Sequence, residues 1–239
     1  MSTIDKITPV PSTEAEKSTG IILLAVAAGM LLSVYLLPVI LPSMSHSIVS
    51  SDPKVYWYLS RGSAFVAFGL LWLSMALGLG LTGKMAKVWP GLLQAVDLHE
   101  FTSLLGLGAA LFHGLILTGD RYIQFTQLQV LIPFASQGYE PIWVGIGQVA
   151  FYVWGIIALS FYVRKQIGAK TWRLIHLTSF MAFAMAMLHG IASGTDSGTV
   201  WAMLMYWGSA GSLLFLLAYR VLVSLPVFGT KKAAQVSHE

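Results

Sequence analysis

The stretch LHEFTSLLGLGAALFHG, from Leu98 to Gly114, is apolar except at its start and carries two histidines, His99 and His113. It lies inside the longer apolar run Leu92–Thr118, and about 20 apolar residues are enough to cross a bilayer as a helix. Polar side chains inside a membrane helix are costly and usually have a function. The stretch therefore predicts a transmembrane helix whose two histidines have a specific purpose.

The composition places the whole chain in a membrane. Of its 239 residues, 56% are hydrophobic and 10% are charged, whereas about 25% of a soluble domain is charged. Six runs pass the length test for a spanning helix: Gly20–Pro42, Tyr56–Thr82, Leu92–Thr118, Ile142–Val163, Leu174–Ala192 and Val200–Pro226. The expected fold is all-α, a six-helix transmembrane bundle over 19–226, with polar tails at 1–18 and 227–239.

The basic residues predict the orientation of the bundle. Eleven Lys and Arg fall on the side that holds both tails, and three fall on the other side. Cytoplasmic loops carry the excess of Lys and Arg, so both termini are expected in the cytoplasm. This membrane role accounts for the net charge of +4 without a nucleic-acid partner. The chain has no cysteine, which excludes thiolate-ligated haem, iron–sulfur clusters and a CxxCH haem attachment.

The fifth run repeats the pattern of the third. LIHLTSFMAFAMAMLHG, from Leu174 to Gly190, carries His176 and His189. The third and fifth runs cross in the same direction, and their histidine spacings correspond to rises of about 21 and 19.5 Å. We therefore expect an inner pair, His99 with His176, and an outer pair, His113 with His189. The azimuth of His176 and His189 differs by about 140° on an ideal helix, so the fifth segment must twist locally or the ligand planes must be rotated.

Two iron porphyrins fit two stacked histidine pairs better than other chemistry does. Zinc takes four ligands at one level, and a proton relay usually adds buried acids. A lone membrane histidine is more often a helix-packing group. Gly106 would let a flat macrocycle approach the backbone. Arg61 at the outer level and Arg173 at the inner level would pair with the porphyrin carboxylates, or would reach to the headgroups.

The connection 119–141 between the third and fourth runs mixes apolar and polar residues. It is expected to lie on the membrane interface as a short amphipathic helix, to cover the outer site, or to bind a partner.

The histidine array, TWRLIH at Thr171–His176 and RGSAFVAFGLLWLSMALGL from Arg61 resemble the ferric reductase-like transmembrane domain. That family includes metalloreductases, the membrane part of NADPH oxidases, and stand-alone YedZ/MsrQ-type subunits of methionine sulfoxide repair. The resemblance covers about Tyr56 to Pro226. It implies two b-type haems on the four histidines and an electron-transfer oxidoreductase subunit that carries electrons from the inside to the outside of, most simply, a bacterial cytoplasmic membrane.

The larger family members carry a C-terminal flavin and NADPH domain, and no FAD or NADPH site is expected on this chain. The expected donor is a separate protein or a quinol, and the expected acceptor is Fe3+, O2 or an extracytoplasmic partner protein. Two alternatives remain open. One is a cytochrome b-like quinol:acceptor subunit, whose haem-binding core has four helices. The other is a haem-free structural subunit of a larger membrane complex, which would be colourless.

Overall fold

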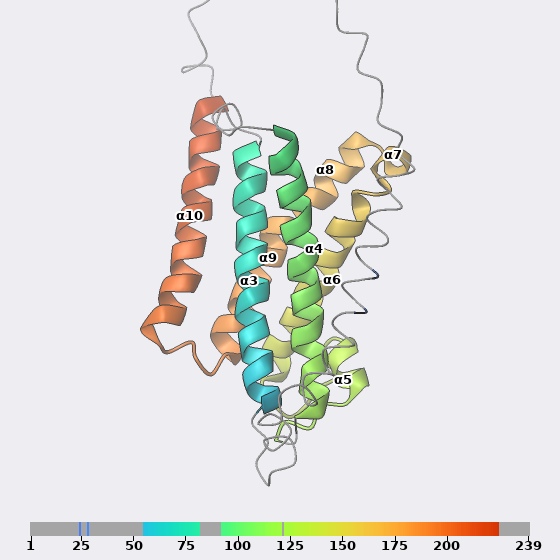
Figure 1. Ribbon diagram of the computed structural model, residues 1–239, viewed down its shortest axis with the longest axis vertical. Helices are drawn as coiled ribbons and strands as arrows, with labels where there is room; N and C mark the ends of the chain where they lie inside the picture. Colours follow the sequence, from blue (N-terminus) through green and yellow to red (C-terminus); the bar gives the residue numbers. More distant parts are fainter. Residues whose placement is uncertain (1–23, 25–27, 29–54, 82–91, 121, 225–239) are drawn as a thin grey trace, which may run out of the picture.

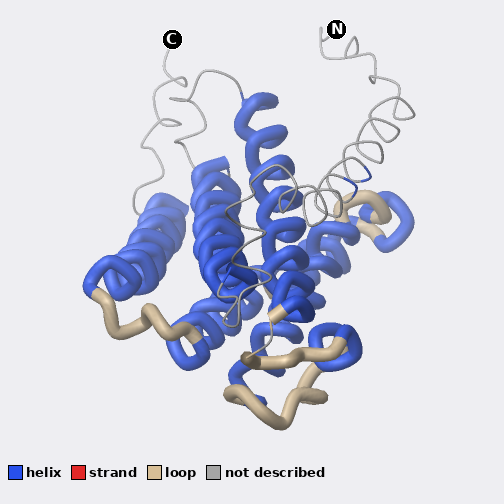
Figure 2. The backbone as a smooth tube through the Cα atoms, turned by 60° about the horizontal axis from the view of Figure 1, so that its bottom comes forward, coloured by secondary structure: helices blue, strands red, loops and turns tan. Residues whose placement is uncertain are grey.

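A computed structural model describes residues 24, 28, 55–81, 92–120 and 122–224. These residues form helices and loops and no strand (Figures 1 and 2). The long helices are α3 (Val55–Leu81), α4 (Leu92–Ile116), α6 (Pro141–Ser160), α9 (Ser179–Ser193) and α10 (Val200–Ser224). The shorter ones are η2 (Leu117–Gly119), α5 (Gln127–Leu131), α7 (Arg164–Ile167) and α8 (Ala169–Leu177). The expected all-α fold is confirmed for this part of the chain.

Five segments of the described residues are long and apolar enough to cross a membrane: Val55–Leu81, Gln94–Gly119, Pro141–Ser160, Ala169–Ser193 and Val200–Val223. They coincide with the second to sixth predicted runs. Of the first predicted run, Gly20–Pro42, all but Leu24 and Ala28 lie outside the described residues, and so do the two polar tails. The spanning helices expose large apolar side chains such as Leu204, Trp207 and Phe215, each more than 60% exposed, which is the surface that a lipid environment covers.

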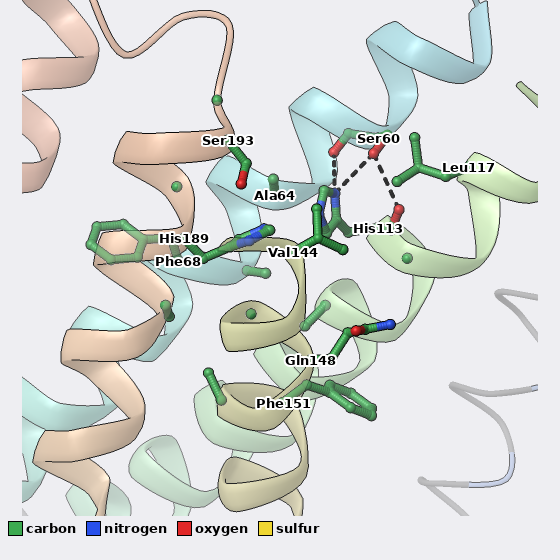
Figure 3. Close-up of a pocket in the computed structure, with 18 of the residues that line it drawn as sticks. Ser60, Ala64, Phe68, His113, Leu117, Val144, Gln148, Phe151, His189 and Ser193 are labelled. Atoms are coloured by element: carbon green, nitrogen blue, oxygen red, sulfur yellow. Dashed lines mark hydrogen bonds between the residues drawn. The ribbon is translucent and has the colours of Figure 1, made fainter. Parts of the chain in front are cut away.

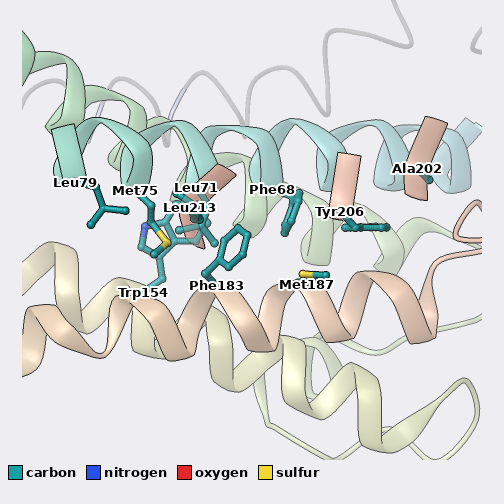
Figure 4. Packing of buried hydrophobic residues seen from close by; sticks show 10 residues of the cluster. All are labelled: Phe68, Leu71, Met75, Leu79, Trp154, Phe183, Met187, Ala202, Tyr206 and Leu213. Carbon is teal, nitrogen blue, oxygen red and sulfur yellow. The ribbon is translucent and has the colours of Figure 1, made fainter. Parts of the chain in front are cut away.

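The helices pack around one apolar core. α3 runs along α4 and carries α10 on another side, while α6 packs along α9. Side chains of α3, α6, α9 and α10 meet in this core (Figure 4): Phe68, Leu71, Met75, Leu79, Trp154, Phe183, Met187, Ala202, Tyr206 and Leu213. Phe68 and Phe183 stack with ring centroids 5.3 Å apart. Leu107 and Ala110 of α4 pack against this core, which therefore connects the helix of His99 and His113 with that of His189.

The fifth predicted segment is not one regular helix. It is divided at Thr178 into α8 and α9. The Thr178 N–H donates to the Ile175 carbonyl at 3.0 Å, a tight i→i−3 bond of the 3₁₀ type, and the Thr178 hydroxyl donates to the same carbonyl at 2.6 Å. A tighter turn changes the direction in which the side chains of α9 point around the helix axis, relative to those of α8. The local twist that His176 and His189 require is therefore present, and it lies between them.

Candidate functional site

The four membrane histidines form the two pairs that their spacing predicts. His99 faces His176, and His113 faces His189, and in each pair the ring centroids lie 6.1 Å apart. The ring planes are inclined by 67° in the first pair and 70° in the second. The pairs thus have the same separation and nearly the same mutual orientation at two levels of the bundle.

Backbone carbonyls determine which ring nitrogen is free. Nδ1 of His99 lies 2.7 Å from the Ser74 carbonyl, and Nδ1 of His113 lies 2.8 Å from the Ser60 carbonyl. Nδ1 of His189 lies 2.9 Å from the carbonyl of Trp143. A carbonyl oxygen can only accept, so Nδ1 carries the proton in each ring and Nε2 keeps its lone pair. This is the arrangement in which metal-binding histidines are normally held.

His176 is held differently, by a ring contact. The Trp172 indole stacks on its imidazole, with ring centroids 5.2 Å apart and planes inclined by 29°. Trp172 and His176 both belong to α8 and lie four residues apart, so they share one helix face. The stack fixes the plane of His176 from within its own helix.

An apolar cavity surrounds each pair. The inner cavity, of about 850 Å³, contains His99 and His176, and the outer cavity, of about 220 Å³, contains His113 and His189 (Figure 3). Leu71, Trp154 and Ala182 line both cavities. The wall between the two sites is therefore built of apolar side chains from three helices.

The pairs have the separation that a metal ion between two imidazoles requires. A metal–imidazole bond is about 2 Å long and the ring centre lies about 1 Å beyond its nitrogen, so two rings on opposite sides of one ion have centroids about 6 Å apart. Among the described residues, no three His, Asp, Glu or Cys side chains gather as a metal-holding group. A metal at these pairs would need its other ligands from a chelate such as a porphyrin, and the 6.1 Å separation of the imidazole rings is compatible with one.

Polar groups border each cavity, as the carboxylates of a porphyrin would require. Arg61 lines the outer cavity but makes a two-point ion pair with Asp196, in which Nε donates to the carboxylate at 2.7 Å. Arg173 lines the inner cavity together with Lys170 and Arg220, and its Nε donates to the carbonyl of its own helix at Ala169. The inner cavity is thus the more basic of the two.

A buried polar atom at each cavity has no hydrogen-bond partner among the described residues: Trp172 Nε1 at the inner cavity and Ser193 Oγ at the outer cavity. Buried polar groups are nearly always paired. A ligand with acceptor groups would provide the missing partners.

Gly106 lies against the Trp154 side chain, whereas the sequence led us to expect a flat macrocycle at this glycine. A Cβ at Gly106 would lie 2.7 Å from the Trp154 ring, so this glycine admits the indole that separates the cavities. Two other glycines contact the histidines instead. A Cβ at Gly78 would lie 3.1 Å from the His99 ring, and one at Gly147 would lie 2.5 Å from Nδ1 of His189.

The connection 119–141 forms part of the wall of the outer cavity. Its helix α5 begins with a capping box, in which Thr126 and Gln129 satisfy each other's backbone N–H groups, and Phe125, Gln129, Val130 and Leu131 line the cavity. Gln148 of α6 holds it: the amide nitrogen donates to the carbonyls of Gln129 and Val130, and the amide oxygen accepts from the Phe134 N–H. Of the three roles left open by the sequence, covering the outer site is the one that these contacts support.

Several site residues are not evident from the sequence pattern: Ser60, Ser74, Gly147, Gln148 and Asp196. The two serines repeat the fourteen-residue spacing of His99 and His113, which is a usable signal, while the others meet the site only through the tertiary fold. Chemically, each level offers two imidazole rings with centroids 6.1 Å apart in apolar surroundings. The chain matches no protein-family model, no curated protein and no solved structure.

Proposed function

We propose that this chain is a membrane electron carrier that holds two b-type haems, an inner one between His99 and His176 and an outer one between His113 and His189. The observation that carries the proposal is the equal 6.1 Å separation of the two histidine pairs. Iron porphyrin supplies reversible one-electron chemistry at each level when it is bound. The chain's own residues bind and orient it and exclude water.

Three features of the described residues support this role. Carbonyls hold the Nδ1 protons of His99, His113 and His189, which leaves Nε2 of each ring available to bind a metal. The levels are separated by about 21 Å of helix, and apolar side chains, including the Phe68–Phe183 stack, fill the space between them. The basic inner rim, where Lys170, Arg173 and Arg220 outnumber Glu100, is suited to the carboxylates of a porphyrin.

The direction of electron flow and the partners belong to the same proposal. With the inner pair on the cytoplasmic side, a cytoplasmic protein or a membrane quinol would reduce the inner level, and a metal ion, O2 or a partner reductase would accept electrons outside. This is the arrangement of stand-alone ferric reductase-like subunits. A flavin and NADPH site would then belong to another protein.

The test is a dithionite-reduced minus oxidised spectrum of the purified protein, with the haem counted as its pyridine haemochrome. We expect two b haems per chain, and one haem after either His113→Ala or His189→Ala, because each change removes an axial ligand of the outer level only. His46→Ala is the control; His46 lies outside the described residues and belongs to neither pair, so both haems should remain. Colourless protein from haem-producing cells would overturn the proposal and favour the structural-subunit alternative.

A further inference from the structure

Helix α3 makes the same three contacts with each histidine of α4. At the outer level, the Ser60 carbonyl lies 2.8 Å from Nδ1 of His113, the Ser60 hydroxyl oxygen lies 2.9 Å from the same nitrogen, and this hydroxyl donates to the His113 carbonyl at 3.2 Å (Figure 3). At the inner level, the corresponding distances between Ser74 and His99 are 2.7, 3.1 and 3.2 Å. One geometry is thus built twice.

The repetition follows from the helix register. Ser60 and Ser74 are separated by fourteen residues, as are His99 and His113, and α3 and α4 are antiparallel neighbours. Fourteen residues are close to four full helical turns, so both serines lie on the face of α3 that meets the histidine face of α4. The Ser60–His113 contact and the Ser74–His99 contact are therefore two copies of the same side-chain arrangement.

The hydroxyl oxygens add to what the carbonyls do. Each hydroxyl proton goes to a histidine carbonyl, so the oxygen presents lone pairs to the nearby Nδ1–H, which it shares with the serine carbonyl. Ser60 and Ser74 are only 2% and 4% exposed, so bulk water has little access to replace them. A stronger acceptor at Nδ1 makes Nε2 a better electron donor to a metal.

We infer that Ser60 and Ser74 are a matched pair of positioning residues, which hold the rings of His113 and His99 and tune, each at one level, the donor strength of the ligand nitrogen. This inference rests on the proposed function. Two serines of one helix, α3, would thus set the donor strength of the ligand nitrogen separately at the inner and at the outer level.

The experiment is a redox titration of the full-length protein carrying Ser60→Ala or Ser74→Ala. We expect two haems in each variant and an upward shift in the midpoint potential of one haem, because a weaker donor stabilises the oxidised iron less. Combination with His189→Ala, which leaves only the inner haem, assigns the shift: Ser74→Ala should move the remaining haem, and Ser60→Ala should not. Ser160→Ala in α6 is the control, since Ser160 is equally buried and its hydroxyl bonds only to its own helix at Ile157.

A second pair of variants separates the hydroxyl from the shape of the side chain. Thr and Val have nearly the same shape, so Ser60→Thr should keep the wild-type potential and Ser60→Val should show the shift, even where the Ala variant fails to accumulate. Unchanged potentials in the Val and Ala variants, or an equal shift in Ser160→Ala, would overturn the inference while leaving a dihaem protein. Absence of haem from the wild-type chain would instead overturn the proposed function.

Discussion

At the scale of single residues, backbone carbonyls fix the orientation of three of the four membrane histidines. The Nδ1 atoms of His99, His113 and His189 each face a carbonyl oxygen of another helix. The same residue scale distinguishes the two rims. Arg61 is paired with Asp196 at the outer rim, while the inner rim combines Lys170, Arg173 and Arg220 with Glu100, so only the inner rim has an excess of basic residues.

Tyr139 at the outer cavity is expected to make stability depend on alkaline pH. Its hydroxyl donates to the Ser193 carbonyl at 2.7 Å, and burial, with Glu140 and Tyr122 adding, raises its pKa above the usual 10.0. The folded state therefore favours the protonated phenol. Its contribution is complete below pH 10 and is lost as the pH rises through the folded pKa. Thermal unfolding of Tyr139→Phe from pH 8 to 11 should show the variant approach the wild type above pH 10; parallel curves would contradict this.

At the scale of elements, Gly147 lets α6 approach the helix that holds His189 closely. A Cβ at Gly147 would collide with the His189 ring, whereas a Cβ at Gly155 would meet nothing within 4 Å. The two glycines lie in the same helix, so they separate the effect of the contact from the effect of helix propensity.

We therefore expect opposite results from two alanine substitutions in α6. Gly147→Ala should displace the His189 ring from the Trp143 carbonyl, with loss of the outer haem and a destabilisation of about 1–3 kcal/mol from overpacking. Gly155→Ala should keep both haems and gain up to about 1 kcal/mol from helix propensity. Haem content and melting temperature measure both effects. Loss of the outer haem in Gly155→Ala as well would show that the contact at His189 is not the cause.

The positions of the helices follow from apolar length alone, which is why five predicted runs match the described spans within a few residues. The break between α8 and α9 at Thr178 is harder to predict from the sequence. The azimuth of His176 and His189 requires a local twist, but the residue at which it occurs depends on a hydroxyl bond to Ile175 that no periodicity records. The contact of Gly147 with His189 joins two helices and has no local signal.

At the scale of the whole molecule, the connection 119–141 forms part of the wall of the outer cavity. Gln148 holds it through three hydrogen bonds to the backbone between Gln129 and Phe134, and Tyr152 adds a bond to the Leu131 carbonyl. The segment between Gln129 and Phe134 is therefore fastened to α6 beside the cavity that contains His113.

Gln148→Ala should loosen this segment without touching a histidine. Each lost hydrogen bond is worth about 1 kcal/mol, so amide exchange between Gln129 and Phe134 should accelerate about tenfold or more. Gln137→Ala is the matched control, because Gln137 makes only a 3.5 Å contact with the Phe134 carbonyl in the same segment. Equal exchange rates in the two variants would show that Gln148 does not hold the segment.

The histidine pairs could be predicted because depth in a membrane is proportional to position along a helix. The partners of the histidines could not, since they depend on which helices become neighbours. Arg61 was expected beside a carboxylate of the cofactor, and the structure gives it a carboxylate of the chain, Asp196, far away in sequence. Gly106 was expected at the macrocycle and lies against Trp154. The position of a residue along its helix thus predicts its depth in the membrane, whereas helix packing determines which side chains it contacts.

The repeated serine–histidine contact limits how the length of this chain can change. One residue inserted into α3 between Ser60 and Ser74 would rotate one serine by about 100° relative to the other, so only one of the two contacts with α4 could survive. The same holds for an insertion between His99 and His113. The spacing of the two serines and the spacing of the two histidines can therefore change only together, and only by a whole number of helical turns. Insertions and deletions should be tolerated in the loops and not in α3 and α4.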